Sequence, residues 1–371
     1  MKIVFTGGGT GGHFYPIIAI VQKVNQIIDQ ENIIGAKLYY VSDSPYDKEI
    51  LFEHGLIYEE VMAGKMRTYF SLRNFVDIFK MLFGSIGALY KIFSIYPDVV
   101  FGKGGYASFP VLLAARILRI PIIIHESDSV PGRVNKWAGK FADKVAVSFK
   151  EAAEYFPENK VAWTGHPLRV EIENVAPRIE ALKYFKFESD IPVLLVLGGS
   201  LGSLIINNTI LDALPRLVKN FQIIHQTGVK NYKNVSSRGE VVLSKMPEKS
   251  RYICKPFLNP LEMKMASGVA NIIVSRAGST IFEIASWGIP SIIVPISNSN
   301  GDHQRRNAFS YAHTGGCIVV EEMNMTGNIL SSEIERITGD QDIMQSMSKN
   351  AKAFHKHDAS MKIAKVLVDT A

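Results

Sequence analysis

The chain has 371 residues, which at roughly 100–200 residues per domain predicts two domains. Hydrophobic residues make up 47% of it and charged residues 20%, a balance that excludes disorder and is typical of a globular protein. The net charge of +6 favours an anionic partner such as a nucleotide, a diphosphate or an acidic membrane surface. Cys254 and Cys317 lack metal-binding spacing and indicate a reducing compartment.

Short apolar runs alternate with helical patterns in the first half of the chain, which predicts a parallel α/β sheet. The apolar run at the N-terminus is too short for a signal peptide and is interpreted as the first strand. Expected strands are 3–6, 37–41, 99–101, 122–125, 144–148 and 161–164, and expected helices include 16–30 and 110–118.

The pattern pauses at residues 169–190, a polar segment with no strong strand signal, and then restarts. In the second half we expect strands at 193–197, 222–225, 272–274 and 291–294, a helix at 204–218, and a charged helical region at 331–368. The sheet pattern therefore occurs twice. We predict an α/β fold of two Rossmann-like, doubly wound parallel-sheet domains facing a central cleft, with ligands at the carboxyl ends of the strands.

Glycine-rich turns follow three predicted strands, at 7–13, 102–106 and 198–203. Glycine lets the backbone approach a ligand closely, and a helix N-terminus offers free N–H groups to an anion. The first turn fits G-x-G-x-x-G, and with Asp43 it leaves a nicotinamide dehydrogenase open. Lys103 makes a diphosphate contact at the second turn attractive. Three such turns exceed what one NAD requires.

Polar residues in the second half suggest a nucleotide-sugar pocket. Glu283 follows the turn 275–280 by one helical turn, where it could bind ribose hydroxyls or serve as a capping-box acid. The segment 300–307 offers amides and imidazoles to a sugar or phosphate, or is a solvated helix start. In the first half, His13 is a candidate base because a neutral imidazole is well poised near pH 7, or a helix-capping histidine.

Short motifs, collinear over about residues 1–325, carry a resemblance to a known family. They are Gly8-Gly9-Thr10-Gly11-Gly12-His13, Gly104-Gly105-Tyr106, His125-Glu126, Gly165-His166-Pro167-Leu168-Arg169, Gly198-Gly199-Ser200-Leu201-Gly202, His225-Gln226-Thr227-Gly228, Ser275-Arg276-Ala277-Gly278-Ser279 and His303-Gln304. Together they resemble the MurG family (family 28, GT-B fold), bacterial hexosyltransferases that move N-acetylglucosamine from UDP-GlcNAc to lipid I, forming lipid II in peptidoglycan synthesis.

The resemblance implies an N-terminal acceptor- and membrane-binding domain at 1–168 and a C-terminal donor-binding domain at 169–350. A C-terminal helix at 351–371 would pack back toward the N-terminal domain. The reaction would be an inverting displacement with His13 as the base and His125, Glu126 and Asp128 as alternatives. Asp128, where the family often has Asn, would also be a candidate sugar contact.

By the same resemblance, two sets of residues would bind the substrates. Arg169, Gly199, Ser200, Ser279, Glu283 and Gln304 would hold the donor, and Thr10, Gly11, Gly12, Gly104, Gly105 and Tyr106 the acceptor diphosphate. We expect no cofactor and no metal, because the D-x-D at Asp340-Gln341-Asp342 lies away from every predicted strand end.

The expected partners are UDP-GlcNAc, a lipid-linked diphosphate-sugar acceptor and an anionic membrane surface, at the cytoplasmic side of the inner membrane. Phe75, Phe79 and Leu82 recur at helical spacing among basic residues, which predicts an interfacial helix or, alternatively, a helix packed on the sheet. The longest apolar stretch is about half a membrane-spanning helix, so we expect peripheral attachment. Scattered basic residues argue against nucleic acid.

Other functions remain open at this point. Within enzymes, a GT-B relative with another lipid acceptor or a UDP-GlcNAc 2-epimerase would share the architecture. A non-enzymatic nucleotide-binding protein that anchors a separate catalytic chain would normally contain only one of the two halves.

Overall fold

The computed structural model describes residues 1–371 except 9, 65–71, 200 and 298–299, together with the side chains of all described residues other than 72–76, 78 and 300. The chain divides into two compact units. One comprises Met1–Arg169 with Lys356–Ala371, and the other comprises Val170–His355. The last helix of the second unit is α14 (Gln341–Phe354), which runs past residue 350, the expected end of the C-terminal domain. The chain returns to the first unit after His355.

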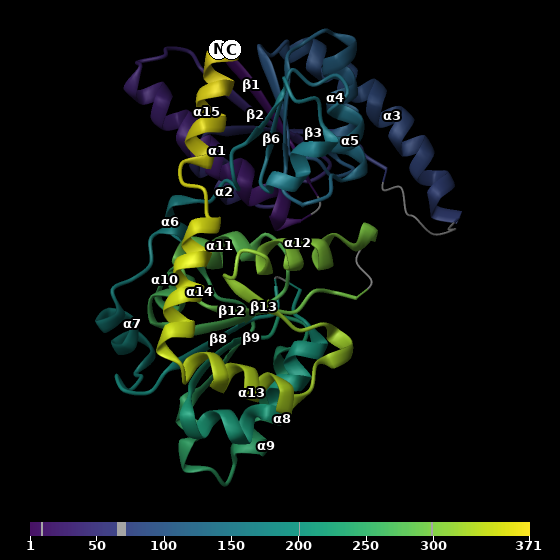
Figure 1. Cartoon of the computed structure of the whole chain (residues 1–371). Helices are drawn as coiled ribbons and strands as arrows, with labels where there is room; N and C mark the ends of the chain where they lie inside the picture. Colours follow the sequence, from purple (N-terminus) through teal and green to yellow (C-terminus); the bar gives the residue numbers. More distant parts are fainter. Residues whose placement is uncertain (9, 65–71, 200, 298–299) are drawn as a thin grey trace. The chain divides into compact units, whose positions relative to one another are not determined.

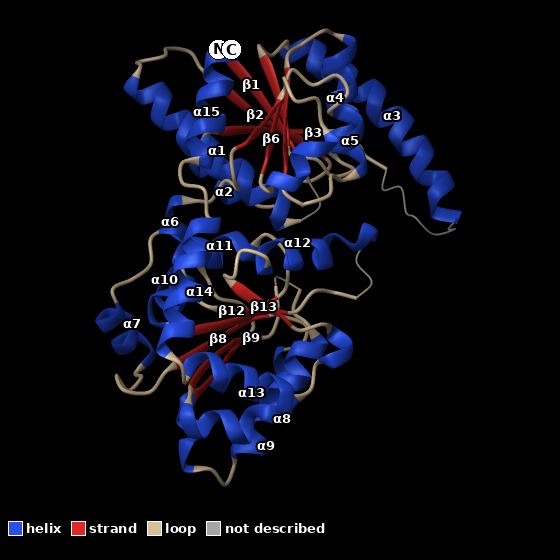
Figure 2. Cartoon of the chain, in the orientation of Figure 1, coloured by secondary structure: helices blue, strands red, loops and turns tan. Residues whose placement is uncertain are grey.

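The first unit contains a seven-stranded sheet in the order β3-β2-β1-β4-β5-β6-β7 (Figure 2). Every neighbouring pair is parallel. Its strands are β1 (Lys2–Thr6), β2 (Lys37–Ser42), β3 (Leu56–Glu60), β4 (Val99–Gly102), β5 (Ile122–Glu126), β6 (Lys144–Val147) and β7 (Val161–Trp163).

Helices connect these strands, and the last helix of the chain joins them. α1 packs along α15 beside the sheet (Figure 1), and one core cluster contains Ile3 and Phe101 from the strands, Ile17 from α1 and Leu367 from α15. The helices of this unit are α1 (Gly11–Gln30), α2 (Lys48–Glu53), α3 (Leu72–Ile95), α4 (Ser108–Ile117), α5 (Arg133–Ala138), the 3-10 helix η1 (Lys150–Tyr155) and α15 (Ala359–Thr370).

The second unit contains a six-stranded sheet in the order β10-β9-β8-β11-β12-β13, also parallel throughout. Its strands are β8 (Val193–Leu197), β9 (Gln222–Gln226), β10 (Tyr252–Lys255), β11 (Ile272–Ser275), β12 (Ser291–Ile293) and β13 (Cys317–Val319).

One core cluster of this unit joins strand residues such as Leu194 and Ile272 to Leu214 of α8 and Ile334 of α13. The helices are α6 (Val170–Glu173), α7 (Arg178–Phe185), α8 (Leu204–Asn220), α9 (Tyr232–Leu243), η2 (Pro247–Arg251), α10 (Pro260–Val269), α11 (Thr280–Trp287), η3 (Asn300–Asp302), α12 (His303–Ala312), η4 (Glu322–Asn324), α13 (Gly327–Thr338) and α14.

The prediction of an α/β fold with two Rossmann-like parallel sheets is confirmed, and every predicted strand is present within one or two residues of its expected bounds. Three strands were not predicted: β3, β10 and β13. Each lies at an edge of its sheet, and none is buried along its whole length. An edge strand needs no continuous apolar run, because only part of it faces the core.

Candidate active site

Each sheet has one place where the strand order reverses. In the first sheet it lies between β1 and β4, and in the second between β8 and β11. In doubly wound sheets the loops diverge there and leave a crevice at the carboxyl ends of the strands. Thr6 pairs with Gly102, and Leu197 pairs with Ser275, so the turns that follow these strands begin side by side. All three predicted glycine turns therefore flank a reversal point.

The first turn leads directly into α1. Tyr40 and Ser42 of β2 donate hydrogen bonds to the Gly7 carbonyl oxygen, at 2.7 and 2.9 Å. These bonds fix the start of the turn, so the chain enters the helix at a defined position. Thr10 is the N-cap residue, and the candidate ligands Gly11 and Gly12 are the first two residues of the helix. Their N–H groups belong to the helix end that attracts anions.

The second turn lies against the first. Gly104 and Gly105 have φ values of +90° and +81°, a conformation that favours glycine. A Cβ atom at Gly105 would lie 3.1 Å from the Gly8 carbonyl oxygen and 3.5 Å from Nε2 of His13. The Tyr106 hydroxyl donates a 2.6 Å hydrogen bond to Asp43. This hydrogen bond ties Tyr106, at the end of the second turn, to Asp43, which follows β2.

His13 is the third residue of α1 and is half-buried. Its Nδ1 lies 3.1 Å from Oγ1 of Thr10, and its backbone N–H donates to the Thr10 carbonyl at 3.0 Å. Burial, and then the positive charge of Lys103, lower the pKa of His13 to about 4, while Asp128 acts in the opposite direction. The ring is therefore neutral at pH 7, as a proton acceptor must be.

The other candidate bases differ sharply in accessibility. His125 is fully buried, and its Nε2 lies 3.2 Å from Oγ of Ser148, so it is part of the core. Glu126 is buried too, and its carboxylate accepts hydrogen bonds from the N–H groups of Asp128 and Gly132 and from Asn135. Both residues shape the loop after β5. Asp128 in that loop is only half-buried, and its charge reaches His13.

Lys103 does not lie where the sequence suggested. Its side chain is 2% exposed, and its ammonium group donates to Oγ of Ser127 beneath the glycine turns. The expected contact between Lys103 and a diphosphate is therefore wrong. The reason is that Lys103 immediately follows the buried strand β4, so its side chain turns into the unit.

In the second unit, the turn after β8 is held by contacts with the turn after β9. Gly199, Gly202 and Gly228 have φ values of +84°, +76° and +85°. Gly202 packs so closely on the Thr227 carbonyl that a Cβ would lie 2.1 Å from its oxygen. Ser203 caps α8 by accepting from the Ile206 N–H at 3.3 Å. The expected ligand Gly199 lies in this turn, and Ser200 lies outside the described residues.

The turn after β11 ends at Ser279 and leads into α11, which carries Glu283. Ser279 is the N-cap residue of α11, but its side chain makes no capping hydrogen bond. Glu283 is the fourth residue of the helix, one position beyond the third, where a capping-box acid must stand. The capping-box alternative for Glu283 is therefore wrong. Its carboxylate is half-buried in the first turn of α11, at the second reversal point.

Gln304 lies in the first turn of α12, and its side-chain oxygen accepts a 3.2 Å hydrogen bond from the Ile296 N–H. That bond ties α12 to the loop after β12, next to β11 in the sheet. Arg276, which follows β11, is occupied by a 2.6 Å ion pair with Glu322 and a 3.0 Å hydrogen bond to the Val294 carbonyl. Arg276 thus connects the end of β11 to the residue that follows β12 and to Glu322.

Comparisons with known proteins agree with this two-sheet arrangement. The model of the glycosyltransferase family 28 N-terminal domain matches residues 3–147, and that of the family 28 C-terminal domain matches residues 193–363. The chain belongs to glycosyltransferase family 28. The first match includes β1 to β6 and the second β8 to β13, so each contains the reversal point of its sheet and the glycine turns beside it.

Two curated relatives span nearly the whole chain. A Borrelia turicatae protein named UDP-N-acetylglucosamine–N-acetylmuramyl-(pentapeptide) pyrophosphoryl-undecaprenol N-acetylglucosamine transferase is 36% identical over 99% of this chain and 96% of its own length. A Clostridium kluyveri protein of the same name is 34% identical over 99% of this chain and 98% of its own.

Solved structures share the fold. The crystal structure of Acinetobacter baumannii MurG superimposes with a TM-score of 0.75 at 23% identity, covering 99% of each chain. A UDP-GlcNAc 2-epimerase from Neisseria meningitidis, bound to UDP-GlcNAc, gives 0.68 at 15% identity over the full length of both chains. With the first of these, the GT-B fold is established for this family 28 chain.

Arg169, expected in the donor-binding half, is instead the last residue of the first segment of the first unit. Its guanidinium lies over the ring of Tyr15, 4.1 Å from the centroid. The positive charge is therefore held against α1, two residues along that helix from His13. The stacking contact is what sequence reasoning could not foresee, because Tyr15 and Arg169 are far apart in the chain.

One face of α3 is apolar and exposed. Phe79 and Leu82 are 46% and 56% exposed, whereas Ala88 and Ile92 on the opposite side are buried. The alternative that this stripe packs on the sheet is wrong for Phe79 and Leu82, and the side chain of Phe75 lies outside the described residues. In the described part of the chain, no helix is both long and apolar enough to cross a membrane. The exposed face comprises Phe79, Leu82, Phe83, Ile86, Tyr90 and Phe93.

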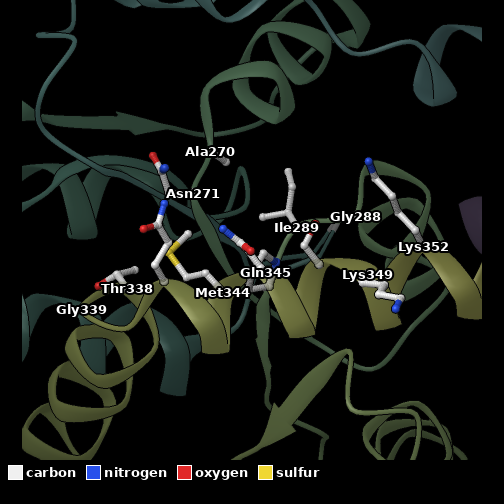
Figure 3. Close-up of a pocket in the computed structure, with 13 residues that line it drawn as sticks. Ala270, Asn271, Gly288, Ile289, Thr338, Gly339, Met344, Gln345, Lys349 and Lys352 are labelled. Carbon is white, nitrogen blue, oxygen red and sulfur yellow. The ribbon is translucent and has the colours of Figure 1, made fainter.

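A surface hollow of about 870 Å³ lies elsewhere in the second unit (Figure 3). Its lining includes Asn271, which precedes β11, and Pro290, which precedes β12, with Gln345 and Lys349 of α14. It therefore lies at the amino ends of the strands, away from the glycine turns. Among the described residues, no group of three or more His, Cys, Asp or Glu side chains could hold a metal ion.

The contact between the first two turns predicts the effect of a single methyl group. Gly105→Ala should lower both the melting temperature and the transfer rate, because left-handed backbone costs a non-glycine residue about 1–2 kcal/mol and the new methyl group would lie only 3.1 Å from the Gly8 carbonyl oxygen. Gly132→Ala is the matched control, since Gly132 has φ −62° and open space around it. Equal effects of the two substitutions, in thermal unfolding and in the assay, would contradict the close packing of the turns.

Proposed function

We propose that this chain transfers N-acetylglucosamine from UDP-GlcNAc to an undecaprenyl-pyrophosphoryl N-acetylmuramyl-pentapeptide, the lipid I to lipid II step of peptidoglycan synthesis. The observation that carries the proposal is similarity of 34–36% over both halves of the chain to relatives that bear the name of this transferase. The glycine turns at both reversal points support it, because two diphosphate groups must be bound, one in the donor and one in the acceptor.

The donor is bound by the second unit in this proposal. Backbone N–H groups of the turn at Gly199, and Ser200 beside it, meet the UDP phosphates, and Ser279 contributes at the start of α11. Glu283 accepts hydrogen bonds from the ribose hydroxyls, and Gln304 binds the transferred sugar. Their common position at the carboxyl ends of β8, β11 and β12 supports these roles.

The acceptor diphosphate is bound by the first unit. Thr10, Gly11 and Gly12 offer the N-terminus of α1, whose N–H groups and dipole favour an anion. The second turn, at Gly104, Gly105 and Tyr106, lies against the first and extends the same surface. Asp128 contacts a sugar. Arg169, held by Tyr15, adds positive charge for the departing UDP diphosphate.

The reaction in this proposal is a single displacement with inversion. The acceptor hydroxyl oxygen forms a bond to C1 of N-acetylglucosamine while the bond from C1 to the UDP oxygen breaks. UDP leaves with the bonding electrons, and the hydroxyl proton passes to the neutral ring of His13. Helix N-termini and Arg169 stabilise the charge that develops on the leaving group.

The transfer assay tests the proposal directly. Radiolabelled UDP-GlcNAc with a lipid I analogue should yield labelled lipid and one UDP for each sugar transferred. UDP-GlcNAc alone should remain unchanged over the same time. Conversion of UDP-GlcNAc to another UDP-sugar without an acceptor would support the epimerase alternative, and neither product would contradict the proposal.

The pH dependence of turnover tests the role of His13. Because its pKa is lowered to about 4, the free enzyme should keep kcat/KM constant from neutral pH to about pH 5 and lose it as the ring is protonated below that. A bound diphosphate favours the protonated ring, so the fall in kcat should occur at higher pH. His13→Ala should lower kcat by about 10²-fold or more.

His313→Ala is the control for this series, since His313 is exposed at the end of α12. A normal kcat for His13→Ala would remove His13 as the base. The same conclusion would follow if the acid limbs of kcat and kcat/KM coincided near pH 6.5, the value of an unperturbed histidine.

The exposed face of α3 supports peripheral binding to an anionic membrane, on the cytoplasmic side, where the lipid acceptor is anchored. Phe79→Ser with Leu82→Ser should reduce flotation of the protein with vesicles that contain anionic lipid, because both side chains are exposed and apolar. Met323→Ser is the control, as Met323 is 82% exposed but belongs to the second unit. Unchanged flotation of a folded double variant would exclude this face as the membrane contact.

A further inference from the structure

Lys103 is a buried charge that the proposed reaction does not use. Its backbone N–H donates to the Thr6 carbonyl at 2.8 Å, and its side chain packs beneath Gly7, where an added Cβ would lie 2.9 Å from Cβ of Lys103. With only 2% of the residue exposed, the ammonium group has lost nearly all of its water. A buried ammonium persists only where opposite charge and hydrogen bonds replace that water.

Two carboxylates supply the opposite charge: Glu126, the last residue of β5, and Asp128 in the loop that follows. Glu126 is 4% exposed and Asp128 is half-buried. Burial lowers the pKa of Lys103 to about 8, and the charges of Glu126 and then Asp128 work against that lowering. Between these acids stands Ser127, whose hydroxyl accepts the hydrogen bond from the Lys103 ammonium. Lys103 therefore faces the whole segment.

The two acids are not equivalent. Glu126 already accepts hydrogen bonds from two backbone N–H groups and from the Asn135 amide. These bonds stabilise its charge and fix the loop after β5. Asp128 lies closer to the surface, and its charge reaches His13 at the glycine turn. A carboxylate there would repel an acceptor diphosphate unless a cation compensates for it. Lys103 is the cation beside that segment, since its ammonium donates a hydrogen bond to Ser127, the residue before Asp128.

We propose that Lys103 is a positioning residue whose buried ammonium neutralises Asp128 and holds the Ser127–Asp128 segment, so that an acid can stand beside a diphosphate-binding turn. This inference rests on the proposed function for its benefit to the acceptor. The charged and titratable groups that face Lys103 are His13 from α1, His125 and Glu126 from β5, and Asp128, with His166 reaching Ser127 at 3.4 Å.

A double-mutant cycle tests the coupling. Lys103→Met keeps the length of the side chain and removes its charge, and should lower kcat/KM by about tenfold or more, mainly through a higher KM for the lipid acceptor. Asp128→Asn in the Lys103→Met background should restore most of that loss, because the uncompensated acid is gone. Asp128→Asn alone removes the charge but keeps a polar side chain for the proposed sugar contact, so kcat/KM should fall by less than in Lys103→Met. Equal effects of Asp128→Asn in the two backgrounds would overturn the proposal.

The control for the cycle is Lys160→Met, since the Lys160 ammonium donates to the Ala142 carbonyl at 2.9 Å in the same unit. Its effect should be independent of Asp128→Asn. Lys103→Arg keeps the charge and should retain more activity than Lys103→Met. If the Lys103→Met and Lys103→Arg variants lost equal activity, the shape of the lysine side chain would matter and not its charge. That result would also overturn the proposal.

Thermal unfolding gives a reading that does not depend on transferase activity. Lys103→Met should lower the melting temperature, and Asp128→Asn should recover part of the loss only in that background. If the wild-type chain transfers no sugar but the cycle in melting temperature shows this coupling, the proposed function fails and the Lys103–Asp128 pairing stands. If sugar is transferred and neither cycle shows coupling, the pairing fails alone.

Discussion

The placement of glycine turns where the strand order of a parallel sheet reverses is the constraint around which both units are built. A parallel sheet brings the carboxyl ends of all its strands to one edge, and the reversal of strand order leaves room there for a ligand. In the first unit that room lies beside the turns after β1 and β4, and in the second beside the turns after β8 and β11. Glycine at +81° to +90° after β4, and at +84° after β8, is what lets those turns form.

Beneath the first pair of turns lies a layer of buried charge that the glycine motif does not reveal. Lys103, Glu126 and His125 all carry polar groups with almost no access to water. Each is held by neighbours: Ser127, Asn135 and Ser148 supply hydrogen bonds, and the opposite charges of Lys103 and Glu126 offset each other. Burial is the main reason that the pKa of His13 is lowered, and this layer adds to it, because the charge of Lys103 disfavours a second cation nearby. The protonation of a residue at the surface turn thus depends in part on a buried residue of the layer beneath it.

Much of this arrangement could be predicted from the sequence. Central strands such as β1 and β8 are buried on both faces and are therefore unbroken apolar runs, and glycine follows them at once. The edge strands β3 and β10 were missed because Leu56–Glu60 and Tyr252–Lys255 mix polar with apolar residues. The orientation of Lys103 could not be predicted either, since a lysine in a glycine turn has the same local pattern whether it points to a ligand or into the core. The tertiary contact between Lys103 and Ser127, 24 residues along the chain, shows that the lysine points into the core.

Hydrogen exchange in the presence of UDP tests most directly whether the glycine turns of the second unit bind the diphosphate. We predict slower exchange of the amides at 201–203 and in the first turn of α11, where the strand order reverses, and no change around Asn271 and Gly288 at the hollow on the other edge of the sheet. Protection confined to that hollow, with the glycine turn unaffected, would contradict this assignment of the donor site.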